Sequence, residues 1–143
     1  MTTRTHKEPM QINPHKIAAV LAQLGSFATT YGCVMALGGK GQLGFWLAVG
    51  IEVLLAAGKS LVFDGKKSNT DAFGWIAILL DTLLNAGGIW PMVQVLDKAP
   101  SWIMLKESMG MDGDMGKLPA LIVALVLGYL LSVAPHRLWR GGS

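Results

Sequence analysis

Four long apolar runs dominate the sequence and decide what it can fold into. They cover residues 16–37, 44–63, 72–96 and 118–134. Each run falls within the range of roughly 17–25 residues that an α-helix needs to cross the hydrocarbon core of a bilayer. Only 15% of the 143 residues are charged, whereas about 25% is usual in soluble domains. The sequence therefore predicts an all-α integral membrane protein, a single membrane domain of four transmembrane helices.

Polar and glycine-rich connections separate the runs and favour an up-down antiparallel bundle. Residues 38–41 (Gly-Gly-Lys-Gly) follow the first run, and the polar residues 64–71 follow the second. Residues 97–117 form the only long connection, which we assign to the outer side of the membrane. Within it, residues 101–109 form a short amphipathic stretch that is expected to lie flat in the interface.

Two prolines bear on the course of the predicted helices. Pro91 follows Gly87 and Gly88 late in the third run, and this predicts a kink or loosened turn there. Pro135 stands one residue beyond the fourth run and is expected to lie near the exit of that helix, because proline is common just after a helix end.

The distribution of basic residues predicts the orientation. Four spans place both termini on one side, which then holds seven lysines and arginines against four on the other. The seven are Arg4, Lys7, Lys16, Lys66, Lys67, Arg137 and Arg140, and the four are Lys40, Lys98, Lys106 and Lys117. Because basic residues are enriched in cytoplasmic loops, both termini, with the leader 1–15, are expected in the cytoplasm. We expect a bacterial inner membrane.

The five tryptophans are predicted to be interfacial anchors. Trp75 and Trp139 fall at the inner boundary, and Trp46 and Trp90 fall towards the outer one. Trp102 belongs to the outer loop. Tryptophan is enriched at both membrane–water interfaces, so this placement agrees with four spans.

Three ionisable residues fall inside the second and third runs: Glu52, Lys59 and Asp81. A charge at the centre of a spanning helix costs roughly 2.5–3.5 kcal/mol even on lenient scales. At about 1.5 Å per residue from the cytoplasmic ends, Glu52 lies about 16 Å deep and Asp81 about 13 Å deep. The two acids are therefore expected to face each other across one hairpin. Lys59, about 6 Å deep, would either reach the interface or pair with Asp81.

Other polar residues share this depth. Asn85 follows Asp81 by four residues and so lies on the same helix face. Gln23 in the first run is at a similar depth to Asp81, and Thr29 and Thr30 are possible neighbours. The sequence thus predicts a polar seam through the bundle. The candidate intramembrane site consists of Gln23, Glu52, Lys59, Asp81 and Asn85.

The seam has two interpretations. In the functional one, two nearby carboxylates bind and release a proton or another cation. In the structural one, the polar groups hold helices in register through hydrogen bonds, each worth only about 0.6 kcal/mol on average. We favour the structural interpretation for Asp81 and Asn85 and the functional one for Glu52.

Small residues recur at four-residue spacing, which lets helix backbones approach closely. The sets are Ala18, Ala22 and Ser26; Ala28, Gly32 and Ala36; and Gly44 with Ala48. This spacing predicts tight packing and self-association, but it does not separate contacts within one chain from contacts between chains.

Several kinds of chemistry find no support. The single cysteine, Cys33, excludes an intrachain disulfide and a cysteine-based zinc site. The basic residues flank apolar runs, so lipid headgroups are expected as partners rather than nucleic acid. No Ser/His/Asp arrangement or Cys/His pair falls on plausible shared faces, so we expect no enzyme and no cofactor. The methionines of the outer loop suit Cu(I) or an adaptable apolar contact, and we favour the contact. They are Met104, Met109, Met111 and Met115.

Two classes of function remain. The first is a non-enzymatic structural or assembly subunit of a membrane complex or homo-oligomer, whose buried charges pair with each other or with partner helices. The second is a proton- or cation-conducting subunit that uses Glu52 and Asp81. We favour the first, because no internal repeat, filter motif or gate is visible in the sequence.

Overall fold

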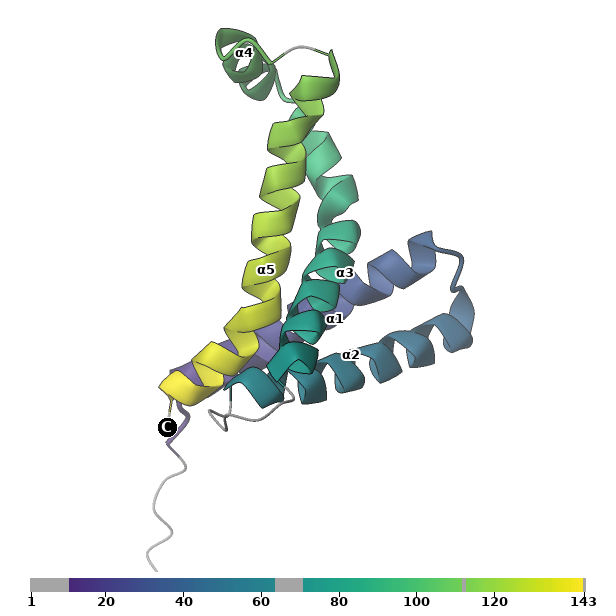
Figure 1. The fold of residues 1–143 in the computed structure, drawn as a ribbon, viewed down its shortest axis with the longest axis vertical. Coiled ribbons are helices and arrows are strands. Elements are labelled where there is room, and N and C mark those ends of the chain that lie inside the picture. Colours follow the sequence, from purple (N-terminus) through teal and green to yellow (C-terminus); the bar gives the residue numbers. More distant parts are fainter. Residues whose placement is uncertain (1–10, 64–70, 112, 143) are drawn as a thin grey trace, which may run out of the picture.

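The computed structural model describes residues 11–63, 71–111 and 113–142, and the regular structure of these residues is entirely helical (Figure 1). The long helices are α1 (Pro14–Ala36), α2 (Gly41–Phe63), α3 (Asp71–Asp97) and α5 (Leu118–Gly141). The short ones are α4 (Pro100–Ser108) and the 3-10 helix η1 (Gly113–Lys117). The four long helices are each long and apolar enough to cross a bilayer. The chain is therefore a multipass membrane protein.

Local signals explain where α1 begins and how it turns into α2. Asn13 caps α1 by accepting a hydrogen bond from the backbone N–H of His15 (3.0 Å). In the turn after α1, Gly38 has φ +105° and Gly41 has φ +68°, a left-handed conformation that favours glycine. A Cβ on Gly44 would lie 2.2 Å from the carbonyl oxygen of Gly39. The glycine-rich residues 38–41 therefore close the first hairpin, as the sequence predicts.

Neither proline ends its helix. α3 runs through Pro91 to Asp97, and α5 runs through Pro135 to Gly141, well past the expected exit at residue 134. Proline fixes a φ that suits a helix and removes one backbone hydrogen bond, so a helix continues where other contacts hold it. Next to Pro135, His136 makes such a contact: its ring stacks on that of Phe63 in α2, with ring centroids 5.1 Å apart. The expected exit of the fourth helix was therefore wrong.

The long helices form two hairpins that meet at one end (Figure 1). In the view, α2 runs back alongside α1, and α5 runs back alongside α3. The hairpins share the end where α2 finishes and α3 starts, and they diverge towards the α1–α2 turn and α4. The backbone of α1 comes close to all three other long helices, whereas the backbones of α2 and α5 come close at few or no points and are joined by side chains. The four helices therefore do not lie side by side over their whole length (Figure 1), and the up-down antiparallel topology across a membrane stays a prediction.

Glycines allow the helices to approach closely where they do meet. A Cβ on Gly88 of α3 would lie 1.9 Å from the carbonyl oxygen of Thr29 on α1. A Cβ on Gly128 of α5 would lie 2.6 Å from that of Thr82 on α3. Apolar side chains gain little by leaving lipid for a neighbouring helix, so small and polar residues decide where membrane helices associate.

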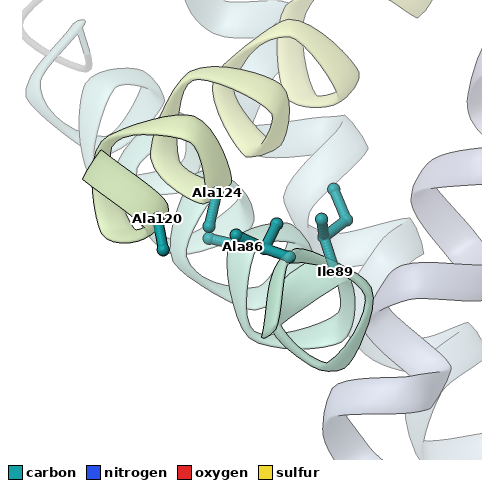
Figure 2. Packing of buried hydrophobic residues seen from close by; sticks show 5 residues of the cluster. Ala86, Ile89, Ala120 and Ala124 are labelled. Atoms are coloured by element: carbon teal, nitrogen blue, oxygen red, sulfur yellow. The ribbon is translucent and has the colours of Figure 1, made fainter. Parts of the chain in front are cut away.

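The apolar packing follows the same rule. A buried apolar cluster joins α3 and α5, and alanines make up much of it (Figure 2). Its buried members are Ala86, Ile89, Val93, Ala120 and Ala124. In Figure 2, Ala120 and Ala124 of α5 lie against the α3 side chains, so the two helix axes can approach closely along this seam.

Hydrogen bonds stabilise the segment that connects α3 to α5, the two helices of the second hairpin. Asp97, at the end of α3, accepts hydrogen bonds from Trp102 Nε1 (3.1 Å) and Lys106 Nζ (2.6 Å) of α4. Lys106 also donates to the carbonyl oxygen of Gly116 in η1 (3.2 Å). The helical stretch expected at residues 101–109 is thus present as α4. Its position in the outer interface stays a prediction.

Some residues used for the orientation lie outside the described residues. They are Arg4, Lys7, Lys66 and Lys67, together with most of the leader 1–15. The side chains of Trp46, Trp75 and Trp139 are more than half exposed, at 65%, 58% and 52%, and those of Trp90 and Trp102 are partly buried. An anchor needs such access to lipid, but the membrane boundaries themselves stay a prediction.

The glycine contact between α1 and α3 can be tested by adding one methyl group. Gly88→Ala should lower the free energy of unfolding by about 1–3 kcal/mol, because the new Cβ meets the backbone of Thr29, which cannot move aside cheaply. Gly50→Ala is the matched control, since nothing lies within 4 Å of its Cβ position. It should be neutral or slightly stabilising. SDS titration of the purified protein in mixed micelles measures both, and equal effects would contradict the close α1–α3 contact.

Candidate intramembrane polar site

Lys59 and Asp81 form an ion pair in the interior of the protein. Lys59 Nζ contacts Asp81 Oδ2, and both side chains are 0% exposed. Lys59 Nζ also donates to the backbone carbonyl oxygen of Ser132 on α5 (3.1 Å). One ammonium group therefore joins α2, α3 and α5. Of the two roles expected for Lys59, the geometry corresponds to the Asp81 partner and not to a side chain that reaches the interface.

The second carboxylate oxygen of Asp81 takes no part in the ion pair. Asp81 Oδ1 is buried and accepts no hydrogen bond from the described residues. The pair therefore rests on one carboxylate oxygen and one ammonium group. An ion pair in a medium of low dielectric is held strongly together, and removal of either member leaves the other as an isolated buried charge.

Glu52 lies apart from that ion pair and is bound by one face of α1. Gln23 Nε2 donates to Glu52 Oε2 (2.8 Å), and Thr30 Oγ1 donates to Glu52 Oε1 (2.5 Å). Ser26 Oγ lies 3.4 Å from Oε1. The three donors are three, four and seven residues apart, which is the spacing of one helix face. Glu52 is only 5% exposed, so its carboxylate joins α1 to α2 inside the protein.

Ser26 and Asn85 link Glu52 to α3. Ser26 Oγ lies 3.2 Å from both Oδ1 and Nδ2 of Asn85, and both residues are 0% exposed. Thr29 Oγ1 also contacts Asn85 Oδ1. A hydroxyl has a single proton, so Ser26 donates to Glu52 or to Asn85 and accepts from the amide. The polar seam thus runs from α2 through α1 to α3.

The hydrogen bonds and the ion pair give the two acids separate partners, and whether they face each other across the hairpin stays a prediction. Glu52 is bound by α1, and Asp81 is bound by Lys59. The reason is that α1 lies against both α2 and α3 at this level and brings its hydroxyl and amide groups to Glu52. All five residues of the candidate site, Gln23, Glu52, Lys59, Asp81 and Asn85, are buried or partly buried.

A pocket of about 510 Å³ borders Glu52 and Gln23. The rest of its lining comes from all three helices around it: Ala19, Val20, Val53, Ala56, Pro135, His136, Trp139 and Arg140. α1 packs against both α2 and α5. Val20, Val53 and Trp139 are each at least half exposed, so the pocket opens to the surroundings of the protein.

Sequence reasoning missed parts of this arrangement. It did not find the role of the Ser132 carbonyl, because a backbone acceptor leaves no mark in the sequence. It also missed Ser26 as a polar link, although the residue was noted as small. His136, Trp139 and Arg140 reach the pocket because α5 continues past Pro135. A helical sequence pattern that continues past Pro135 was the signal that could have identified these three residues.

Comparison with known proteins adds no assignment. The chain matches no protein-family model, and neither a curated protein sequence nor a solved structure matches it significantly. Among the described residues, no group of three or more histidine, cysteine, aspartate or glutamate side chains is placed to hold a metal ion.

The ion pair can be tested by removing one partner and then both. Asp81→Asn should lower the free energy of unfolding by about 3–5 kcal/mol, because it leaves the Lys59 ammonium buried without its counter-charge. The double variant Lys59→Met/Asp81→Leu should recover a large part of that loss, because it buries no charge. The measurement is SDS titration in mixed micelles.

Lys106→Met is the control for this experiment, because its pair with Asp97 is partly exposed, at 14% and 27%. It should change the free energy of unfolding by about 1 kcal/mol or less. The single variants Lys59→Met and Asp81→Leu complete the comparison. If the loss of stability in the double variant equals the sum of the losses in these two, Lys59 and Asp81 do not interact.

Proposed function

We propose that this protein is a non-enzymatic structural or assembly subunit of a membrane complex or of a homo-oligomer. The observation that carries the proposal is the Lys59–Asp81 pair, whose two side chains are 0% exposed and whose charges cancel inside one chain. Together with the hydrogen bonds to Glu52, it gives the buried polar groups a packing role. These groups fix one arrangement of the helices, on whose outer surface partner contacts can form.

The surface of the first hairpin supports an assembly role. Only 22% of the span window of α1, and likewise of α2, is buried, compared with 39% in α3 and 33% in the fourth span. On α1, Ser26 is fully buried, whereas Ala28, Gly32 and Ala36 are exposed. One small-residue face of α1 therefore packs within the chain. On the other face Gly32 lies near Gly88 of α3, and Ala28 and Ala36 are available to a second copy or to another subunit.

The second candidate is a proton- or cation-conducting subunit, and the pocket beside Glu52 is the observation that favours it. A path through both acids would also have to pass Asp81. That carboxylate is fully buried and paired with Lys59. We therefore rank conduction second.

The orientation and location belong to the same proposal. The excess of lysine and arginine on the side of the termini, seven against four, supports cytoplasmic termini. A bacterial inner membrane is the location we propose for it.

The two candidate functions are separated by measuring ion flux and oligomer mass on the same liposome preparation. We expect no proton, sodium or potassium flux above that of empty liposomes, and a mass above that of one chain. Flux that Glu52→Gln or Asp81→Asn abolishes while the oligomer persists would overturn the assembly proposal in favour of conduction.

A second pair of variants tests the surface that we assign to assembly. Ala28→Leu/Ala36→Leu fills the exposed small-residue face of α1 and should shift the oligomer towards single chains without unfolding them. Ala72→Leu, an exposed alanine on α3, is the control and should leave the mass unchanged. An unchanged mass in the double variant would exclude this face as the interface.

A further inference from the structure

The buried charged residues are two acids and one lysine: Glu52, Asp81 and Lys59. Lys59 neutralises Asp81, and the other ion pair among the described residues joins Lys106 to Asp97 at the end of α3. Glu52 receives hydrogen bonds from the amide of Gln23 and from hydroxyl groups, all of them neutral. Glu52 thus makes no ion pair of its own with the residues that the structure describes.

The pocket of about 510 Å³ leads to this carboxylate. Its volume lies within the range of roughly 300–1,000 Å³ of small-molecule sites. Most of its lining is apolar, with Val20, Val53 and Ala56 among the side chains, and its few polar groups include Glu52 and Gln23. This combination suits a ligand with an apolar body and one polar group that reaches Glu52.

The charge of the ligand follows from where the charged groups lie. His136 and Arg140 also line the pocket, and Lys16 lies 5.3 Å from the centre of the Trp139 ring. Arg140 and Lys16 are exposed, so water, salt and headgroups screen their charges. Glu52 is 5% exposed, and the field of a buried charge is screened much less. The buried end of the pocket therefore attracts a positive group.

We propose that this pocket binds a lipophilic organic cation, with Glu52 as the counter-charge. The apolar body lies against Val20, Val53 and Ala56, and the positive group lies at the carboxylate. A metal ion fits less well, since hard cations need six or more oxygen ligands or retained water, and the pocket offers one carboxylate and one amide. The proposal goes beyond the assembly role and holds whether or not the chain is part of a larger complex.

The test uses the full chain in phosphatidylcholine nanodiscs and radiolabelled tetraphenylphosphonium as the probe. Empty nanodiscs give the background from partition into lipid. Tetraphenylborate, which has nearly the same shape and the opposite charge, is the matched probe. We expect saturable binding of the cation and none of the anion.

Two kinds of variant link the binding to this pocket. Glu52→Gln should weaken binding of tetraphenylphosphonium by about tenfold or more, because it removes a buried counter-charge. Val53→Trp keeps Glu52 but fills the pocket, and it should weaken binding to a similar degree even if the first variant folds poorly. Leu54→Trp is its control, because Leu54 is 74% exposed and does not line the pocket. It should bind like the unaltered protein.

Other outcomes would overturn the proposal. Equal binding of the cation and the anion would show an apolar site without charge selection, and preference for the anion would assign the site to the basic groups at its mouth. Absence of saturable binding, or binding that Val53→Trp and Leu54→Trp affect equally, would show that this pocket does not take such a ligand.

Discussion

The arrangement of this protein depends on how it accommodates charge inside apolar helices. The Lys59 ammonium group cannot be buried without a partner, because an isolated charge in hydrocarbon carries a large desolvation penalty. Its contacts with Asp81 on α3 and with the Ser132 carbonyl on α5 offset that penalty within one chain. Since these contacts come from three helices, satisfying one ammonium group also fixes the positions of α2, α3 and α5.

Small residues then determine how far each pair of helices stays together. Gly88 lets α3 approach the backbone of α1, and Ala120 and Ala124 let α5 approach α3. Large apolar side chains cover much of the exposed surface of the first hairpin, and lipid accommodates them as well as another helix does. The divergence of the hairpins in Figure 1 and the polar seam therefore have one cause: helices associate where small or polar groups meet.

The sequence predicted the elements better than their arrangement. Hydrophobic runs of spanning length identified the four long helices, and the glycines of residues 38–41 identified the first turn. Pro135 was misjudged, because whether a helix continues past a proline depends on contacts such as the His136–Phe63 stack. The residues of the polar seam were identifiable because charge is rare inside a span. The pairing of Lys59 with Asp81 was one of two expected alternatives. The depth of Glu52, in contrast, does not reveal that α1 supplies its donors.

The central claim is that Lys59 and Asp81 pair within one chain. Solid-state NMR tests it directly in lipid, through the dipolar coupling between ¹⁵N in the lysine side chain and ¹³Cγ of aspartate. Lys106→Met removes the second lysine–aspartate pair that the structure describes. The account predicts one short contact, which Lys59→Met abolishes. It also predicts that the contact disappears when chains labelled only with ¹⁵N are mixed with chains labelled only with ¹³C. A contact that persists in the mixed sample would place the pair between chains, and no contact in the doubly labelled protein would contradict the account.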